Sequence, residues 1–257
     1  MHAIKDTWTM AKRSLRHILR SPDTIITVVL MPIAMLLLFV YVFGGALEHQ
    51  TGSVKYVDFL TPGIIVMTVI SGIAYAAFRL GNDIQKGIIN RFRTMPVVPS
   101  SILGGQAASS TLSNLFSSLL VLAVAFAIGF RTSAGPLEWL LFAGLVALFT
   151  LATTWMAIFF GLLAKTAEGA GSFSYILMLL IFISPSFVPT DSMTPALRGF
   201  ADNQPLTPIV ETLRSLLTTG AAGDKAWIAP AWCIGILIIF YLGSLRLYSR
   251  RTMTAAR

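Results

Sequence analysis

The segment "LLFAGLVALFTLATTWMAIFFGLL", residues 140–163, contains no charged side chain and is long enough to cross a lipid bilayer. A helix rises about 1.5 Å per residue, so about 20 apolar residues span a hydrocarbon core about 30 Å thick. Such a length and composition are typical of a transmembrane helix rather than of a helix in a water-soluble core. This segment therefore predicts a membrane protein.

Five further apolar stretches of similar length accompany it, which gives six predicted spans at residues 25–43, 59–78, 112–130, 140–163, 173–188 and 227–245. Prolines fall inside three of them, at Pro32, Pro62 and Pro185, and membrane helices tolerate proline when neighbouring groups satisfy the freed carbonyls. Of the whole chain, 55% is hydrophobic and 12% is charged, against about 25% charged in an ordinary soluble domain. We expect an all-α integral membrane protein in which residues 1–257 form a single transmembrane domain.

The distribution of basic residues predicts the orientation of these spans. An even number of spans places both termini on one side, and lysine and arginine accumulate in cytoplasmic flanks. Most of the 19 basic residues lie in the N-terminal arm, in the second and fourth connections and in the C-terminal tail. We expect both termini in the cytoplasm, with the protein in the plasma (inner) membrane. This topology also explains the net charge of +8, so the charge does not predict nucleic-acid binding.

Two segments outside the spans are amphipathic. Residues 1–21 place apolar residues opposite a basic face, which is typical of a helix lying in the membrane interface. In residues 82–96, Ile84, Ile88 and Phe92 share one helical stripe before Pro96 ends the pattern. Periodicity permits two interpretations of this second segment, an ordinary solvated loop helix or an element that docks into a groove of a soluble partner.

Two other regions also leave alternatives open. Ser109, Ser113 and Ser117 repeat every four residues, a spacing that favours close helix packing and, as the second interpretation, lines a path for a substrate. Residues 189–219 contain Thr-Pro pairs at 194–195 and 207–208, which resemble an N-cap followed by proline in the first helical turn. Two short external helices are expected there, either re-entrant toward the outer leaflet or lying on the surface.

Motifs for chemistry of its own are missing from the chain. The sequence has no G-x-x-x-x-G-K-[ST] phosphate loop, no H-E-x-x-H and no Cys/His cluster with metal-ligand spacing. The single cysteine, Cys233, is expected to be a small buried apolar residue. Ionisable residues fall at span ends or in connections, so no proton relay is evident within the spans. We predict no cofactor, metal or catalytic residue in this chain, and uphill transport would then need a separate ATPase.

The runs "DIQKGIINRFRTMPV", "LGGQ" and "PTDSMTPALRGFADNQPLTPIVETLRSLL", together with the six-span plan and the basic N-terminal helix, resemble the ABC-2 type permease family. Within it they resemble the membrane subunits of daunorubicin-resistance-type drug exporters. In this family the segment between the second and third spans is a coupling helix that docks on a separate ATP-binding subunit. The resemblance gives this role to Asp83, Gly87, Arg91, Phe92, Arg93 and Pro96, and the apolar stripe adds Ile84 and Ile88. Asp83 stands where family members often carry glutamate.

The resemblance also implies an external gate and a cargo. The re-entrant helices of residues 189–219 supply the gate candidates Pro189, Pro195, Asn203, Pro205, Pro208, Glu211 and Arg214. The candidates for a substrate path are Ser113, Ser117, Trp155, Phe159 and Tyr175. Two permeases, identical or related, would work with two ATPase subunits that bind ATP and Mg. The implied function is export of a lipophilic drug or similar amphipathic compound. The alternatives are a lipid, glycolipid or polysaccharide exporter and a non-transporting membrane anchor for a cytoplasmic partner.

Overall fold

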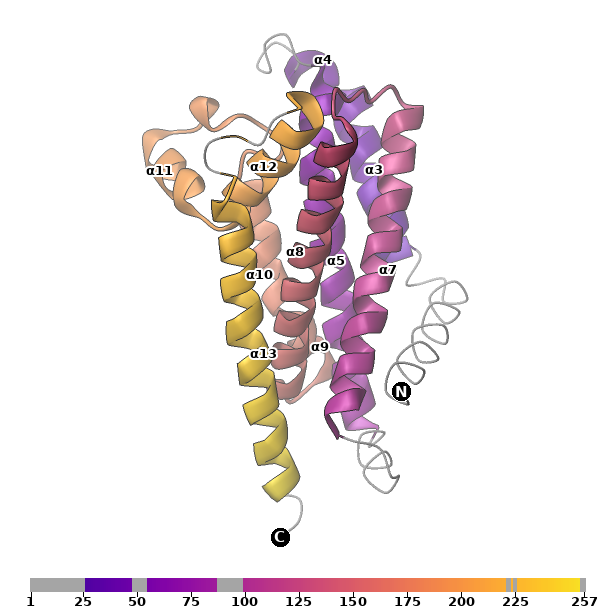
Figure 1. Ribbon diagram of the computed structural model, residues 1–257, viewed down its shortest axis with the longest axis vertical. Coiled ribbons are helices and arrows are strands. Elements are labelled where there is room, and N and C mark those ends of the chain that lie inside the picture. Colours follow the sequence, from indigo (N-terminus) through magenta and orange to yellow (C-terminus); the bar gives the residue numbers. More distant parts are fainter. Residues whose placement is uncertain (1–25, 48–54, 87–98, 221–222, 224–225, 255–257) are drawn as a thin grey trace.

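The computed structural model describes residues 26–47, 55–86, 99–220, 223 and 226–254, which form a bundle of long helices (Figure 1). No strand occurs in these ranges. Five helical stretches are long and apolar enough to cross a membrane, namely Val28–Leu47, Tyr56–Gln85, Leu103–Ala127, Pro136–Leu163 and Ile228–Tyr248. The all-α class and five of the predicted spans are therefore confirmed, whereas the N-terminal helix predicted at residues 1–21 lies outside the described residues.

The first of these stretches is assembled from four short helical pieces. The π-helical turns η1 (Ile26–Leu30) and η2 (Phe39–Phe43) flank α3 (Met31–Leu38), and α4 (Gly44–Leu47) ends the stretch. Pro32 lies in the first turn of α3, directly after η1. A proline in a continuous helix frees one carbonyl group, and a local π-type adjustment is one way in which membrane helices satisfy it again.

The central helix of the bundle is α5 (Tyr56–Gln85). Every residue from Tyr56 to Ile73 is buried except Asp58, and Pro62 lies inside the helix without ending it. Around α5 pack α7 (Pro99–Ala127), α8 (Pro136–Leu163) and the shorter helices described below. The last long helix, α13 (Ile228–Thr254), packs mainly against α8 and carries Cys233, which is buried as expected.

The outer helices expose large apolar side chains. Leu119 on α7 is 61% exposed and Ile239 on α13 is 67% exposed. Residues of this kind occur along the outer helices, and an apolar surface of that extent is unfavourable in water. The hydrocarbon of a bilayer suits it, so the packing agrees with the membrane class that the composition predicts.

The span predicted at residues 173–188 is shorter in the structure. After α9 (Ala167–Gly171), α10 (Phe173–Phe182) ends six residues before the predicted boundary, and residues 183–187 form turns. Pro185 explains this end, because proline has no N–H to donate and disfavours helical geometry in the residue before it. The helical stretch Ala167–Phe182 is therefore shorter than the five membrane helices.

This segment nevertheless runs along most of α5. Near one end, Ala167 and Ala170 lie against Gly81 of α5, and near the other end Ser186 lies against Gly63. At 1.5 Å per residue, α5 rises about 27 Å between these two glycines, close to the thickness of a hydrocarbon core. A short helix and an irregular turn thus cover a distance that the other long segments cover with helix alone. Irregular backbone at such a depth is tolerated where protein surrounds it.

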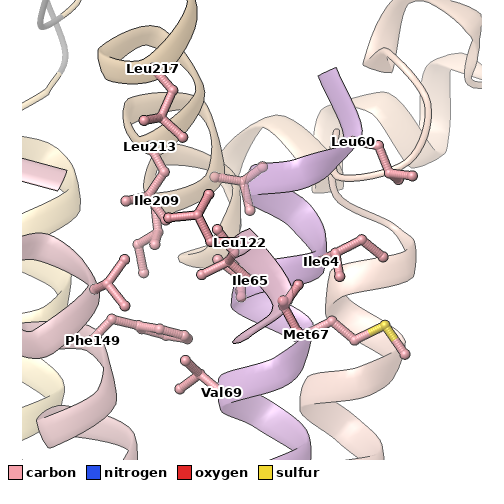
Figure 2. Close-up of a cluster of buried hydrophobic side chains, with 14 of the residues drawn as sticks. Leu60, Ile64, Ile65, Met67, Val69, Leu122, Phe149, Ile209, Leu213 and Leu217 are labelled. Carbon is pink, nitrogen blue, oxygen red and sulfur yellow. The ribbon is translucent and has the colours of Figure 1, made fainter. Parts of the chain in front are cut away.

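The next segment folds into η4 (Thr190–Ser192), α11 (Pro195–Asn203) and α12 (Leu206–Thr218). Figure 2 shows how α12 enters the main core, where its side chains meet α5, α7 and α8. The buried side chains of α12 in this core are Leu206, Ile209, Val210, Leu213, Leu216 and Leu217. In contrast, Leu197 and Phe200 of α11 are exposed. One predicted short helix is therefore part of the bundle, and the other lies on its outside.

The two Thr-Pro pairs differ in their outcome. α11 begins after Thr194 with Pro195 in its first turn, as predicted. α12 begins at Leu206, so the start predicted at Thr207-Pro208 is wrong by two residues. Pro205 takes the N-cap position instead. Pro208 still lies in the first turn of α12, where backbone N–H groups have no partner within the helix, so proline loses no hydrogen bond there.

Candidate functional site

The predicted coupling segment connects the ends of α5 and α7. Asp83 and Ile84 lie in the last turn of α5, so residues 82–85 continue the second membrane helix rather than begin a separate one. This end of α5, the start of α7 and the C-terminal part of α13 lie at the same end of the bundle (Figure 1). The other docking candidates lie outside the described residues, and their role stays a prediction: Gly87, Ile88, Arg91, Phe92, Arg93 and Pro96.

A cluster of side chains joins four helices beside this connection. Leu80 of α5, Leu103 of α7, Leu162 of α8 and Tyr248 of α13 are buried together, and Ile84 packs against them. Because protein interiors are close-packed, a displacement at one member of such a cluster is passed to its neighbours. The cluster therefore packs the end of α5 against α7, α8 and α13.

The loop that precedes α9 lies beside the same connection. Gln85 donates a hydrogen bond from Nε2 to the carbonyl of Lys165 over 3.3 Å. A Cβ atom on Gly81 would lie only 3.0 Å from the Cα of Ala167 and the Cβ of Ala170. Gly81 therefore marks a close contact between α5 and α9, and it does not interrupt α5.

The candidate gate residues lie near the other end of the bundle, where most of them shape the short helices. Pro189 precedes η4, and the remaining prolines, Pro195, Pro205 and Pro208, lie at the starts of α11 and α12. Asn203 ends α11 and donates a hydrogen bond from Nδ2 to the carbonyl of Gly199. Glu211 is exposed on α12, whereas Arg214 of the same helix reaches the long helices.

Arg214 fastens α12 to two other segments. Its Nε donates to the carbonyl of Phe59 over 3.0 Å, and its Nη2 donates to the carbonyl of Pro185 over 2.5 Å. The guanidinium carbon also lies 3.7 Å from the centre of the Phe59 ring, a cation–π contact. The Pro185 carbonyl belongs to the turn after α10, so the side chain of Arg214 bonds a group outside any helix.

The charge of Arg214 persists in this partly buried position. Burial lowers the pKa of Arg214 to about 10, and Glu211 and Tyr56 act in the opposite direction. A pKa of about 10 keeps the guanidinium protonated at neutral pH, so all its donors remain available. The charged side chain of Arg214 therefore connects α12 to α5 and to the turn at Pro185.

The connection between α7 and α8 holds the C-terminal end of α12. Thr132 donates from Oγ1 to the carbonyl of Leu217, and Ser133 donates from Oγ to the carbonyl of Thr218. These bonds satisfy carbonyls that a helix end leaves without partners. One residue earlier, the backbone N–H of Arg131 donates to Oδ1 of Asp58 over 2.8 Å. α12 is therefore tied to α5 both through Arg214 and through this connection.

A small cavity lies between η1, α5 and α7, in the half of α5 that ends at Gln85. Its volume is about 30 Å³, enough for a water molecule or a small polar group. The lining residues are mostly polar and come from three helices: Val28 of η1, then Gly72, Tyr75, Ala76 and Arg79 of α5, and Gln106, Ser109, Ser110, Ser113, Asn114 and Ser117 of α7.

The serine repeat both packs and lines this cavity. Ser113 donates to the carbonyl of Ser109 over 2.8 Å, and Ser117 donates to the carbonyl of Ser113 over 3.1 Å. Each hydroxyl thus bonds within its own helix. Next to the serines, a Cβ atom on Gly72 would lie 1.6 Å from Oδ1 of Asn114, so α7 approaches α5 where glycine has no side chain. The serines therefore lie where α7 packs closely on α5 and beside the cavity, and passage of a substrate stays a prediction.

The other candidates for a substrate path lie elsewhere. Trp155 packs edge-on against Tyr241 with ring centres 4.7 Å apart, and Phe159 packs against Phe240 at 5.4 Å. Both contacts join α8 to α13. Tyr175 lies on α10 and is 77% exposed. The structure therefore does not bring these three aromatic residues together with Ser113 and Ser117.

Sequence reasoning missed the cavity residues that α5 contributes. Gly72, Tyr75 and Arg79 are separated from the serines by a long stretch of chain, and no periodic pattern relates the two helices. The available signal was Gly72, a glycine among larger side chains in the second span. A glycine inside a helix frequently marks a close approach of another segment.

These features define a polytopic helical membrane protein with a basic connection between its second and third membrane helices. The ABC-2 type transporter family model matches residues 5–218, which is most of the chain. The chain therefore belongs to the ABC-2 type transporter family, and the resemblance found in the sequence is confirmed.

Its relatives include permeases that are named for drug resistance. The chain is 27% identical over 256 residues to the daunorubicin resistance ABC transporter permease protein DrrB1 of Streptomyces coeruleorubidus, covering 99% of this chain and 87% of the relative. It is 20% identical over 239 residues to the probable doxorubicin resistance ABC transporter permease protein DrrC of Mycobacterium tuberculosis (strain ATCC 25618 / H37Rv), covering 92% and 85%. It is 24% identical over 191 residues to the inner membrane transport permease YadH of Escherichia coli (strain K12), covering 71% and 72%.

Proposed function

We propose that this chain is the membrane subunit of an ATP-binding cassette exporter that moves a lipophilic drug or similar amphipathic compound out of the cytoplasm or inner leaflet. The single observation that carries the proposal is the family match over residues 5–218. The names of DrrB1 and DrrC support a drug as the cargo. A separate ATPase subunit supplies the energy by binding ATP and Mg, because the sequence lacks a phosphate-binding loop of its own.

The ATPase subunit docks on residues 82–96 in this proposal. Phe92 is the apolar anchor, and Arg91 and Arg93 set the register of docking. The position of the connection supports this assignment, because residues 86–98 join α5 to α7 beside the cluster of Leu80, Leu103, Leu162 and Tyr248. A movement of the docked ATPase is thereby passed to four membrane helices.

The topology that we propose has six crossings, with both termini in the cytoplasm and the protein in the plasma (inner) membrane. The crossing that adds to the five long membrane helices is the segment from Ala167 to Phe187, the fifth in chain order, which follows α5 for a distance comparable to the membrane core. The basic residues of the second connection and of the C-terminal tail support the orientation. The working unit contains a second permease copy or a related permease, as the resemblance to ABC-2 exporters implies.

Transport in this scheme starts at one end of the bundle and finishes at the other. Closure of the ATPase pair pushes the connection at residues 86–98, and α5 carries the displacement along its length. α12 is tied to α5 through Arg214 and through the contact between Arg131 and Asp58. The gate helices therefore move with α5, and the cargo leaves past them on the outer side.

The test is transport of daunorubicin in vesicles that contain the chain and its ATPase subunit. We expect uptake into inside-out vesicles that requires ATP and both proteins. Phe92→Ala should weaken binding of the ATPase roughly 30-fold, the equivalent of about 2 kcal/mol for one hot-spot side chain. Phe200→Ala is the matched control, because this exposed phenylalanine of α11 lies in the gate region, away from the connection.

Three results would contradict parts of this scheme. Unchanged ATPase binding and transport in Phe92→Ala would show that the docking face is wrong. Binding of the ATPase without ATP-dependent flux would favour a membrane anchor. Transport by the chain alone, driven by an ion gradient, would make it a secondary transporter.

A further inference from the structure

We propose that the cavity between η1, α5 and α7 binds the phosphate group of a membrane amphiphile, with Arg79 and Asn114 as its principal contacts. The role of this site in export rests on the proposed function, but binding itself does not require the ATPase. The cavity lies within one chain, between its first three membrane helices.

Asn114 is the most buried polar residue of the lining, at 2% exposed. Buried polar groups in folded proteins nearly always have a hydrogen-bond partner. Because Asn114 lines the cavity, a ligand in the cavity can serve as a partner for its side-chain amide.

The charge of the lining indicates an acidic rather than a basic ligand. Arg79 is the charged residue of the lining, and none of the lining residues is aspartate or glutamate. Arg79 also forms no ion pair with a described carboxylate. A cationic amine would meet an uncompensated positive charge here, whereas an anion would neutralise it.

The hydrogen-bonding groups of the lining suit phosphate in particular. The guanidinium of Arg79 presents a planar fork of donors that matches phosphate oxygens. The amides of Asn114 and Gln106 add further donors. The serine hydroxyls already donate along their own helix and remain acceptors, as shown for Ser113 and Ser117. Phosphate carries several acceptor oxygens, so it can use the donors of both walls at once.

The surroundings of the cavity suit the remainder of an amphiphile. Arg79, Tyr75 and Gln106 are partly exposed, so the cavity is open to the outside. On either side, η1 and α7 expose apolar side chains, including Leu30 at 54% and Leu112 at 44%. Arg79 precedes the end of α5 at Gln85 by six residues, about 9 Å of helix rise, which is near the level expected for headgroups of the inner leaflet. Acyl chains can therefore lie against the apolar faces while the phosphate enters the cavity.

The experiment compares two probes on the full purified chain in detergent. Native mass spectrometry would measure binding of dioleoyl phosphatidylglycerol, which has the phosphate, and of dioleoylglycerol, which has the same acyl chains without it. We expect tighter binding of phosphatidylglycerol. Arg79→Met and Asn114→Asp should each weaken that binding about tenfold, because each removes or opposes a charge-assisted hydrogen bond. Neither should affect dioleoylglycerol.

Lys165→Met is the matched control. Lys165 is an exposed basic residue at the same end of the bundle and does not line the cavity. Its loss should change phosphatidylglycerol binding less than about twofold. Equal binding of the two probes, or equal effects of Arg79→Met and Lys165→Met, would overturn the proposal. If Arg79→Met does not fold, Asn114→Asp gives the same test, because aspartate has the shape of asparagine.

Reconstitution with the ATPase then distinguishes two sources of the phosphate. ATP-dependent movement of labelled phosphatidylglycerol between leaflets, lost in Arg79→Met, would identify the site as one for cargo. Retention of bound phosphatidylglycerol while daunorubicin is transported would identify a bound bilayer lipid, and both results support the proposal. Daunorubicin transport by a chain that does not bind phosphatidylglycerol overturns the cavity proposal alone. Binding without any flux overturns the proposed function alone.

Discussion

Replacing Arg214 by methionine tests whether this residue holds α12 in the bundle. Methionine keeps the apolar stem but removes the donors to the carbonyls of Phe59 and Pro185 and the charge that lies over the Phe59 ring. The Pro185 carbonyl would lose its donor in a turn between buried serines, Ser184 and Ser186. α12 should therefore separate from α5 more often.

The expected size follows from these contacts. Leaving a buried acceptor without its donor costs about 1–3 kcal/mol, and a cation–π contact contributes about 0.5–2 kcal/mol. Because Arg214 is only partly buried, we expect a combined effect of about 2–3 kcal/mol, toward the lower part of these ranges. This corresponds to a roughly 30- to 150-fold rise in the population in which α12 is detached.

Cysteine labelling measures that population. With Leu217→Cys placed on α12 and Cys233→Ala as background, the rate of maleimide labelling reports opening, since position 217 is fully buried in the closed bundle. Arg198→Met is the control, because Arg198 of α11 forms exposed ion pairs with Asp191 and Asp202. Such pairs contribute at most about 1 kcal/mol, or about fivefold. If Arg214→Met raises the labelling rate no more than Arg198→Met does, Arg214 does not hold α12 in the bundle.

Three other predictions follow from single contacts. Gly63→Ala should lower the free energy of unfolding by about 1–3 kcal/mol, because its Cβ would lie 2.7 Å from the carbonyl oxygen of Ser186. Thermal unfolding in detergent measures this, with Gly144→Ala as the control that has open space; equal effects would refute the close contact. Gly72→Ala should destabilise by a similar amount, and Asn114→Ala in the same chain should restore most of the loss, because Oδ1 of Asn114 occupies the space of the new Cβ; additive losses would contradict that reason. The difference in stability between wild type and Arg214→Met should stay constant from about pH 6 to pH 9, because the lowered pKa of Arg214, about 10, lies above that range. Near pH 10 the folded chain holds fewer protons at Arg214 than the unfolded chain, so only there does this residue make the wild type more stable as pH rises. A stability difference between wild type and Arg214→Met that changes below pH 9 would refute a charged Arg214.

The two ends of the bundle differ in how they are held together. Beside the connection at residues 86–98, the contacts are mainly apolar, as in the cluster of Leu80, Leu103, Leu162 and Tyr248. At the other end, α12 combines an apolar face with polar ties from Arg214, Thr132 and Ser133. Apolar packing transmits displacement without fixing one register of hydrogen bonds, whereas directional bonds define one closed arrangement. In the proposed transport scheme, this difference suits an end that moves with the ATPase and an end that closes.

Sequence patterns located the helices better than they located helix ends. The apolar stretch at residues 140–163 lies within α8, Pro136–Leu163, because a long apolar stretch is a local property. The span predicted from residue 112 missed the first turns of α7, which begins at Pro99, because the residues before 112 are polar. In the fifth predicted span, a hydropathy average passed over the break at Pro185. Polar residues inside a helix and proline at its end alter boundaries without changing the apolar average.

By itself, the sequence determined the membrane class and the family, and it predicted six spans, of which the structure confirms five, since apolar length and motif residues are read along the chain. The tertiary structure alone decided that Arg214 bonds Phe59, 155 residues away. It also decided that Asn114 meets Gly72 beside Arg79 and the serines. Such contacts depend on the rotation and depth at which separate helices pack. Hydrophobic periodicity indicates which face of a helix is buried but does not identify the residue that it meets.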